Sequence, residues 1–236
     1  MRDETSVRKA VRDHYAQLAQ DKRPSVSCCG SDSVATTGAP QEAARIYDGC
    51  GSPVEMAEIR EGNVVVDLGS GGGFDVFKAS KLVGPSGHVV GVDATPEMIW
   101  RARETAKKYA FSNVEFRLGE IEHMPVEKDS ADVALSNCVI NLAPDKNAVF
   151  HEAYRILKPG GRLVISDTIS ECTVKVDPED LKAWAECSAG ALPEDEYLSL
   201  IEKAGFINID VKTKTQSCCS QGIASITVTA TKPNRA

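Results

Sequence analysis

The sequence predicts an α/β fold: a doubly wound, Rossmann-like sheet of seven strands, mostly parallel, with a final antiparallel strand. From residue 63 onward, short apolar runs rich in Val and Ile alternate with segments of helical periodicity. These runs lack polar alternation, which is typical of parallel strands covered by helices on both faces. The 236 residues, 42% of them hydrophobic, suffice for one such domain with short appendages.

Each element has its own signal in the chain. An amphipathic helix is expected over residues 5–20, followed by a mobile Ser/Gly/Thr-rich loop. Apolar runs then predict strands at 63–68, 88–93, 114–118, 131–136 and 162–167, with helices at 73–82, 96–109 and 145–157 between them. Lys158-Pro159-Gly160-Gly161 is a stop signal for the last of these helices. A C-terminal helical insertion is expected at 178–189 and 193–204, before closing strands at 206–211 and 223–231.

Composition narrows the classes of function. The net charge of −7 provides no basic footprint for nucleic acid, and no apolar run approaches the roughly 20 residues that span a membrane. The charged start of the chain does not resemble a signal peptide, so a cytoplasmic protein is expected. In such a protein, eight cysteines without a CxxC pair indicate metal-binding or catalytic thiols more than disulfides. The alternative for each one is a small buried hydrophobic residue.

A glycine-rich turn, VVVDLGSGGGFDV, joins the first strand to the helix after it. Its Gly69, Ser70, Gly71 and Gly73 allow a ligand to approach the backbone beside a helix N-terminus. Asp93 ends the second strand, where a carboxylate accepts hydrogen bonds from ribose hydroxyls. The alternative is a tight turn with a capping acid.

Two features favour S-adenosylmethionine over a dinucleotide at this turn. Phe74 stands where the third glycine of a dinucleotide motif belongs, and Asp67 would repel a pyrophosphate. A carboxylate there suits a ligand that carries an ammonium and a sulfonium group. Further predicted cofactor contacts are Ala94, Met98, Gly119, Glu120, Ile121 and Asn137, whereas Glu122 and His123 are equally compatible with a solvated loop.

These motifs resemble those of class I methyltransferases. The likeness rests on DLGSGGG, Asp93, the GEIEHMP turn, SNCVINL and LKPGGRLVISD. The chain is more narrowly similar to arsenite S-adenosylmethionine methyltransferases, through Gly49-Cys50-Gly51, the run 136–146 and the run 185–194. This implies three parts: an N-terminal helix and cysteine-containing loop at 1–49, a methyltransferase domain at 50–170 and an arsenic-binding region that completes the sheet at 171–236.

Three isolated cysteines gain meaning from this likeness. Cys138 follows the fourth strand, so it is expected at the edge of the sheet where the cofactor binds. The resemblance implies that Cys138 and Cys187 bind trivalent arsenic and that Cys50 supplies a third thiol, since soft centres prefer thiolates. The arsenic lone pair would then attack the sulfonium methyl, and catalysis would be mostly positioning.

The resemblance also implies a redox cycle. Cys50 would form a transient disulfide with Cys28 or Cys29, which a reductant such as thioredoxin or glutathione would reverse. The vicinal pair Cys218-Cys219 is a further candidate for capturing arsenicals, its alternative being an exposed loop without a role. Packing is the expected role of Cys172.

The expected function is therefore arsenic detoxification by S-adenosylmethionine-dependent methylation of thiol-bound trivalent arsenic, in a monomer. Two alternatives remain open at this point. One is a methyltransferase acting on a small organic carbon or oxygen nucleophile, and the other is an arsenical-binding sensor or sequestration protein. The first needs a general base, and the second predicts that S-adenosylmethionine does not bind.

Overall fold

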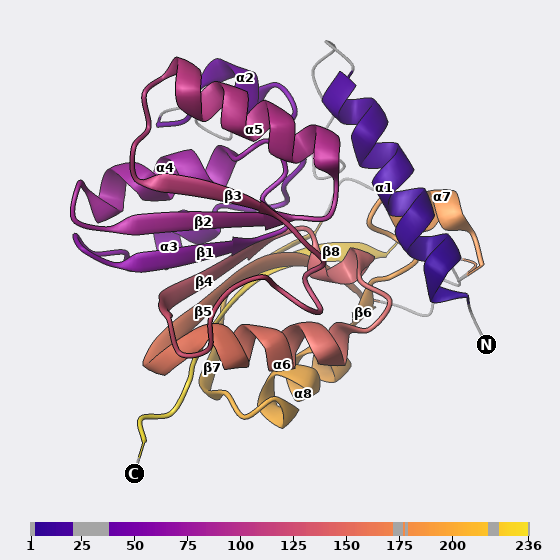
Figure 1. Ribbon diagram of the computed structural model, residues 1–236. Coiled ribbons are helices and arrows are strands. Elements are labelled where there is room, and N and C mark those ends of the chain that lie inside the picture. Colours follow the sequence, from indigo (N-terminus) through magenta and orange to yellow (C-terminus); the bar gives the residue numbers. More distant parts are fainter. Residues whose placement is uncertain (1–2, 21–37, 172–176, 178, 217–221, 236) are drawn as a thin grey trace.

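The computed structural model of the chain describes residues 3–20, 38–171, 177, 179–216 and 222–235. Within this part of the chain, the strands form a single mixed sheet in the order β3-β2-β1-β4-β5-β8-β7, with β6 paired to β5 (Figure 1). The strands are β1 (Val64–Leu68), β2 (His88–Asp93), β3 (Val114–Leu118), β4 (Ala131–Asn137), β5 (Leu157–Ser170), β6 (Leu192–Pro193), β7 (Ile207–Gln216) and β8 (Ile223–Thr231).

The pairing confirms the predicted doubly wound sheet. Strands β1 to β5 pair in parallel, whereas β8 lies antiparallel between β5 and β7. The two-residue β6 adds one strand to the seven expected. The strand order reverses between β1 and β4, and ligands of such sheets bind at the carboxyl ends of the strands at this point.

Helices cover both faces of the sheet. Helices α3, α4 and α5 pack on one face, and α6 and α8 on the other (Figure 1). None of the helices in the described part of the chain is long and apolar enough to cross a membrane. The helices are α1 (Glu4–Gln20), α2 (Gln41–Ala44), α3 (Pro53–Met56), α4 (Phe74–Val83), α5 (Pro96–Lys108), the 3-10 turn η1 (Ile140–Leu142), α6 (Lys146–Ile156), α7 (Leu181–Ala185) and α8 (Glu194–Lys203).

The core divides between these two faces because successive residues of a strand point to opposite sides. On β1, Val66 and Leu68 belong to the cluster that also contains Phe150 of α6 and Tyr197 of α8. Val65, in contrast, packs in the cluster that holds α4 and α5. Helices cover both faces of the strand, which explains the Val-rich run that precedes Asp67 in the sequence.

Three predicted boundaries were wrong. Strand β7 ends at Gln216, five residues beyond the expected 211. Strand β5 begins at Leu157, five residues before the expected 162, because Gly160 and Gly161 pair with the backbone of Lys232 at 2.9 Å on each side. The Lys-Pro-Gly-Gly run therefore ends helix α6 and also opens a strand. Helix α7 is much shorter than the expected 178–189, and Cys187 just after it has a left-handed backbone with φ of 62°.

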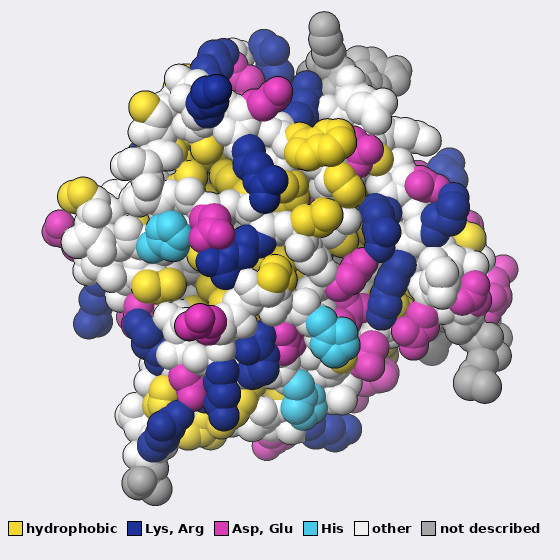
Figure 2. Space-filling model, in the orientation of Figure 1, with side chains coloured by type: hydrophobic (Ala, Val, Ile, Leu, Met, Phe, Trp, Pro, Cys, Tyr) yellow, Lys and Arg dark blue, Asp and Glu magenta, His cyan; other side chains and the backbone are white. Residues whose placement is uncertain are grey.

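Helix α1 crosses the edge of the sheet where the parallel strands end. It packs against α5, which follows β2 in the chain, and against α7, which follows β5 (Figure 1). Val7 and Ala19 are its buried residues. Over the face shown in Figure 2, Lys and Arg side chains are interspersed with Asp and Glu. The amphipathic helix predicted at 5–20 is thus confirmed, and its apolar side faces the pocket described next.

Candidate active site

The glycine-rich loop is held against β2 by backbone hydrogen bonds. The amides of Gly69 and Ser70 donate to the carbonyl oxygen of Val92, at 2.8 and 2.9 Å. The carboxylate of Asp93 accepts from the amides of Gly71 and Thr95, both at 2.8 Å. Gly69, Gly71 and Gly73 all have positive φ, which explains the glycines of this motif. The loop and the acid therefore form one preorganised unit.

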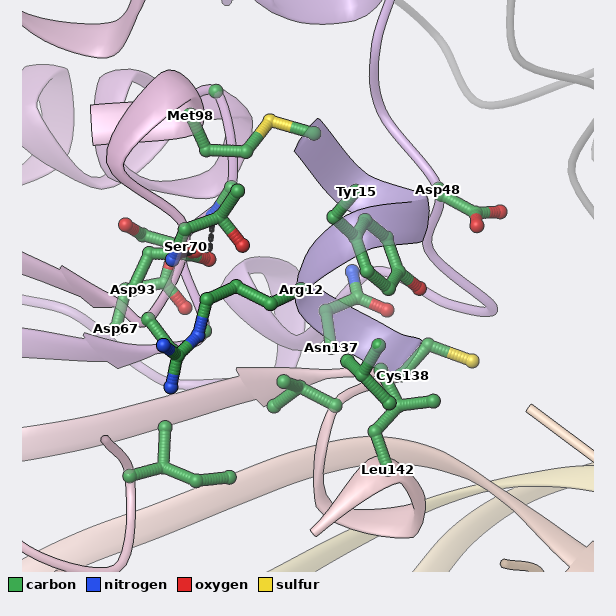
Figure 3. Close-up of a pocket in the computed structure, with 18 of the residues that line it drawn as sticks. Arg12, Tyr15, Asp48, Asp67, Ser70, Asp93, Met98, Asn137, Cys138 and Leu142 are labelled. Atoms are coloured by element: carbon green, nitrogen blue, oxygen red, sulfur yellow. Dashed lines mark hydrogen bonds between the residues drawn. The ribbon is translucent and has the colours of Figure 1, made fainter. Parts of the chain in front are cut away.

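A cavity of about 120 Å³ opens above this loop, which is far more space than one water molecule needs. It is lined by the loop, by the ends of β1, β2 and β4, by the turn after β3 and by α1 (Figure 3). The predicted cofactor residues that line it are Asp67, Gly69, Ser70, Gly71, Asp93, Ala94, Met98, Glu120, Ile121 and Asn137. Gly73 and Gly119, also predicted as cofactor contacts, are not among the lining residues. A Cβ added there would meet Phe116 and Pro125, respectively.

Buried acids give this half of the cavity its electrostatic character. Burial, together with Asp75 and Asp93, raises the pKa of Asp67 well above its ordinary value. Burial also raises the pKa of Asp93, and that of Asp75 to about 6. Three carboxyl groups gathered around one cavity favour a positively charged ligand, because an opposite charge stabilises their ionised forms.

The residues present fit S-adenosylmethionine on two observations. The hydroxyl of Ser70 and one carboxylate oxygen of Asp75 are buried and have no hydrogen-bond partner among the described residues. Polar groups of a ligand would satisfy both of them. The acids suit the ammonium and sulfonium groups of this ligand. Met98 and Ile121 offer an apolar surface to its adenine ring. Asp67, Ser70, Asp75 and Asp93 would hold this ligand, whose chemistry is the supply of an electrophilic methyl group.

The other half of the cavity carries sulfur. Cys138 and Cys187, both nearly fully buried, share an apolar cluster with Leu142, against which Cys50 and Tyr15 pack. The Sγ of Cys187 lies 3.7 Å from the carbonyl oxygen of Cys138. The structure therefore brings the three cysteines singled out by the sequence into one cluster. Among the described residues, however, no three Cys, His, Asp or Glu side chains are arranged to hold a metal ion as they stand.

A buried polar network holds the two buried cysteines in place. The Asp167 carboxylate accepts from the backbone and side-chain amides of Asn141, at 3.1 and 2.7 Å, and from the hydroxyl of Tyr197. Thr168 donates its hydroxyl to the carbonyl oxygen of Cys187 at 3.0 Å. The amide of Asn141 also reaches the sulfur of Cys138, at 3.9 Å. Burial raises the pKa of Asp167 to about 6 despite these donors.

Asn137 anchors the Gly-Cys-Gly turn to the end of β4. Its side-chain oxygen accepts from the amide of Cys50 at 3.1 Å, and its nitrogen donates to the Gly51 carbonyl at 3.0 Å. The same nitrogen contacts the Tyr47 hydroxyl and the Asp75 carboxylate. Asn137 was predicted as a cofactor contact, and it lines the cavity, but its hydrogen bonds to Cys50 and Gly51 fix the Cys50 turn.

The remaining cysteines predicted to act lie outside the described residues. They are Cys28, Cys29, Cys218 and Cys219. Cys172, for which packing was expected, also lies outside the described residues. Trp184, at the end of α7, is buried and donates its indole N–H to the Leu142 carbonyl at 2.8 Å. It therefore braces the segment that follows Cys138.

No site residue was predicted on the N-terminal helix. Arg8, Arg12 and Tyr15 nevertheless line the cavity. Arg8 pairs with Glu122 at 2.9 Å, and Arg12 pairs with Glu120. The signal was partly present, because Tyr15 lies on the apolar face of the predicted helix, but periodicity does not reveal which surface that face covers. Asp75 was also missed, since one acid in a helix's first turn resembles an ordinary N-terminal charge.

Comparison with known proteins matches this geometry to one family. A family described as "Methyltransferase domain" matches residues 59–205. The arsenite methyltransferase of Halobacterium salinarum is 39% identical over 99% of this chain and 68% of its own length. The human arsenite methyltransferase is 41% identical over 70% of this chain but only 46% of its own length. The chain thus spans part of each relative.

A solved structure shares the fold. It is the arsenic (III) S-adenosylmethionine methyltransferase from Chlamydomonas reinhardtii, with a TM-score of 0.71 and 34% identity over 85% of this chain and 72% of that one. A doubly wound sheet with a glycine loop, an acid at the end of β2 and a lined cavity defines a class I methyltransferase, whose cofactor is S-adenosylmethionine. The likeness to these relatives, over most of the chain, shows that the chain belongs to the arsenite methyltransferase family.

Proposed function

We propose that this chain transfers methyl groups from S-adenosylmethionine to trivalent arsenic held by Cys50, Cys138 and Cys187. The observation that carries the proposal is the shared cavity: Cys138 lines the same space as Gly71 and Asp93 of the cofactor half. Cys187 and Cys50 belong to the cluster around Cys138. A methyl donor and a set of soft ligands then face each other within one pocket. Activities of the family's members support the same reaction.

Thiolates bind trivalent arsenic because soft centres prefer sulfur ligands. Arsenic in a three-sulfur pyramid keeps its lone pair free, and this pair is the nucleophile. Holding arsenic requires rotation of the three sulfur side chains toward a common point, since they do not form a ligand set as they stand. Apolar neighbours such as Leu142 and Val139 exclude water from the thiols. The protein's contribution is thus positioning and desolvation.

Electrons must balance across the cycle. When the arsenic lone pair forms the As–C bond and the carbon–sulfur bond of the donor breaks, arsenic is formally oxidised by two electrons. Two cysteine thiolates return these electrons by forming a disulfide, and a thiol reductant such as thioredoxin or glutathione restores the thiols. Cys50 with Cys28 or Cys29 is the pair proposed for this step, and Cys218-Cys219 is proposed to capture arsenicals. The protein is further proposed to be a cytoplasmic monomer that acts in arsenic detoxification.

The test uses the purified chain with S-adenosylmethionine, a thiol reductant and arsenite, with methylated products separated by chromatography. Methylarsenicals are expected with the unaltered chain and are expected to be lost with Cys138→Ser and with Cys187→Ser. Cys172→Ser is the matched control, since it removes a thiol not assigned to the site. Full activity of both site variants would rule out the three-thiol mechanism.

Cofactor binding is tested separately by calorimetric titration with S-adenosylmethionine. Asp93→Ala removes the acceptor of the Gly71 and Thr95 amides and is expected to abolish measurable binding. The two cysteine variants are expected to bind the cofactor as the unaltered chain does. Absence of cofactor binding to the unaltered chain would favour a sensor or sequestration protein instead.

A further inference from the structure

Tyr15 of α1 occupies the boundary between the two halves of the cavity. It packs in the cluster of Ala19, Ile46 and Met98, on the cofactor side. It also packs in the cluster of the buried cysteines, on the thiol side. In Figure 3 its ring points from the helix into the pocket, between Met98 and Cys138. One side chain therefore contacts both halves.

The phenol end of Tyr15 stands at the thiols. Its hydroxyl oxygen lies 4.0 Å from the Sγ of Cys187. Burial, together with the nearby Cys187 and Asp48, raises the pKa of this phenol well above its ordinary value. The ring in this position forms a wall of the cavity beside the thiols.

The helix that carries Tyr15 is held by contacts at several points, which restrict movement of the ring away from the cavity. Arg8, two turns earlier, pairs with the buried Glu122 at 2.9 Å. Val7 is fully buried, and Val11 packs against the cysteine cluster. The helix also packs on α5 and α7. A wall held in this way discriminates by size, because a well-packed apolar site does not expand without loss of contacts.

We propose that Tyr15 is a specificity-determining residue that sets how large a substituent a thiol-bound arsenical can carry. This inference rests on the proposed function, since it assumes that the cysteines bind arsenic. Inorganic arsenite brings only exchangeable oxygens, which sulfur replaces. An arsenical with a carbon substituent keeps that group, and the group must fit among Tyr15, Val139 and Leu142. A methyl group is accepted there, whereas an aryl ring overlaps the space that Tyr15 fills.

The test measures binding of arsenite and phenylarsenite without the methyl donor. The chain contains two tryptophans, so a Trp100→Phe background leaves Trp184 as the single fluorescent reporter. Trp184 is buried and its carbonyl accepts from the amide of Cys187 at 3.1 Å, which makes its emission sensitive to arsenic. In this background, Tyr15→Ala and Tyr15→Leu remove the ring, and Tyr15→Phe keeps it. Gln17→Ala on the exposed side of the same helix is the matched control.

Removal of the ring is expected to shift the ratio of the two dissociation constants toward phenylarsenite by about tenfold, as expected when a pocket wall is opened. Tyr15→Phe and Gln17→Ala are expected to keep the ratio of the unaltered chain. Thermal melting and S-adenosylmethionine titration identify folded variants, and Tyr15→Leu retains apolar packing if Tyr15→Ala unfolds. An unchanged ratio in a folded ring-less variant would overturn the inference alone. Failure of the unaltered chain to bind either arsenical would overturn the proposed function, and this inference with it.

Discussion

The Sγ of Cys187 lies 3.7 Å from the carbonyl oxygen of Cys138, and Cys138 and Cys187 both adopt left-handed conformations, with φ of 57° and 62°. Such a conformation costs a residue other than glycine about 1–2 kcal/mol. The surrounding hydrogen bonds offset this cost: the amide of Cys138 donates to the Ser166 carbonyl at 2.8 Å, and Thr168 donates to the Cys187 carbonyl at 3.0 Å. Two strained cysteines held side by side indicate that the fold directs these sulfurs to one place.

Thr168→Val tests whether this network positions the thiols. Valine keeps the shape of threonine but leaves the Cys187 carbonyl without its hydroxyl donor, which is expected to lower the free energy of unfolding by about 1–3 kcal/mol. Arsenical affinity, measured through Trp184 fluorescence, is expected to fall, while S-adenosylmethionine affinity stays the same. Thr168→Ser retains the hydroxyl and serves as the control. Equal arsenical affinity in the Val and Ser variants would contradict a positioning role.

Arg8→Ala tests how α1 is fastened over the cavity. Glu122 is buried, with 5% of its side chain exposed, and loses its cationic partner in this variant. Arg8 itself is 28% exposed, so solvent screening limits the loss to about 1 kcal/mol. Hydrogen exchange is expected to show weaker protection of α1 amides, and cofactor affinity is expected to fall. Lys9→Ala breaks a pair of exposed side chains on the same helix and is expected to change neither quantity.

The parallel sheet was predictable because strand and helix periodicities are local properties of the sequence. The position of Cys138 was predictable from the strand pattern, because a residue just after a parallel strand lies at the edge of the sheet where ligands bind. The contact of Tyr15 with Cys187 was not predictable, because it joins residues 172 positions apart and depends on how α1 packs. Likewise, the early start of β5 follows from the pairing of Leu157 with Ala131 of β4 and from the bonds of Gly160 and Gly161 to Lys232, which no local signal specifies.

The buried Asp75 predicts a pH dependence of stability. Its pKa is raised to about 6 from an ordinary 3.8, chiefly by burial, although Asn137 donates to it. A carboxyl group whose pKa is higher in the folded state stabilises the fold while protonated, so its contribution is complete below about pH 4 and is lost as pH rises through 6. A difference of about two pKa units corresponds to about 3 kcal/mol.

Asp75→Asn removes this titration. Relative to the unaltered chain, its free energy of unfolding is expected to rise by up to about 3 kcal/mol between pH 4 and pH 7, because only the unaltered chain loses the protonated carboxyl. Urea unfolding at a series of pH values measures the difference. A difference that stays constant with pH, or one that falls, would show that Asp75 does not titrate in this range.

Gly69 links the cofactor loop to the segment that carries Cys138. It has φ of 70°, and an added Cβ would lie 2.2 Å from a methyl carbon of Val139, the residue after Cys138. Gly71, two positions on, has φ of 49°, and a Cβ there would meet no atom within 4 Å. Alanine at either position adopts a left-handed backbone at a cost of about 1–2 kcal/mol. The two positions differ only in what the new methyl group meets.

Gly71→Ala is therefore expected to lower the free energy of unfolding by about 1–2 kcal/mol, and to weaken S-adenosylmethionine binding because its methyl group enters the cavity. Gly69→Ala adds the displacement of Val139, for a total loss of about 2–5 kcal/mol. Because Val139 adjoins Cys138, Gly69→Ala is also expected to weaken arsenite binding without cofactor, whereas Gly71→Ala leaves it unchanged. Urea unfolding and Trp184 fluorescence separate the two effects. If both variants bound arsenite equally well, the glycine loop and the thiol segment would not be mechanically coupled.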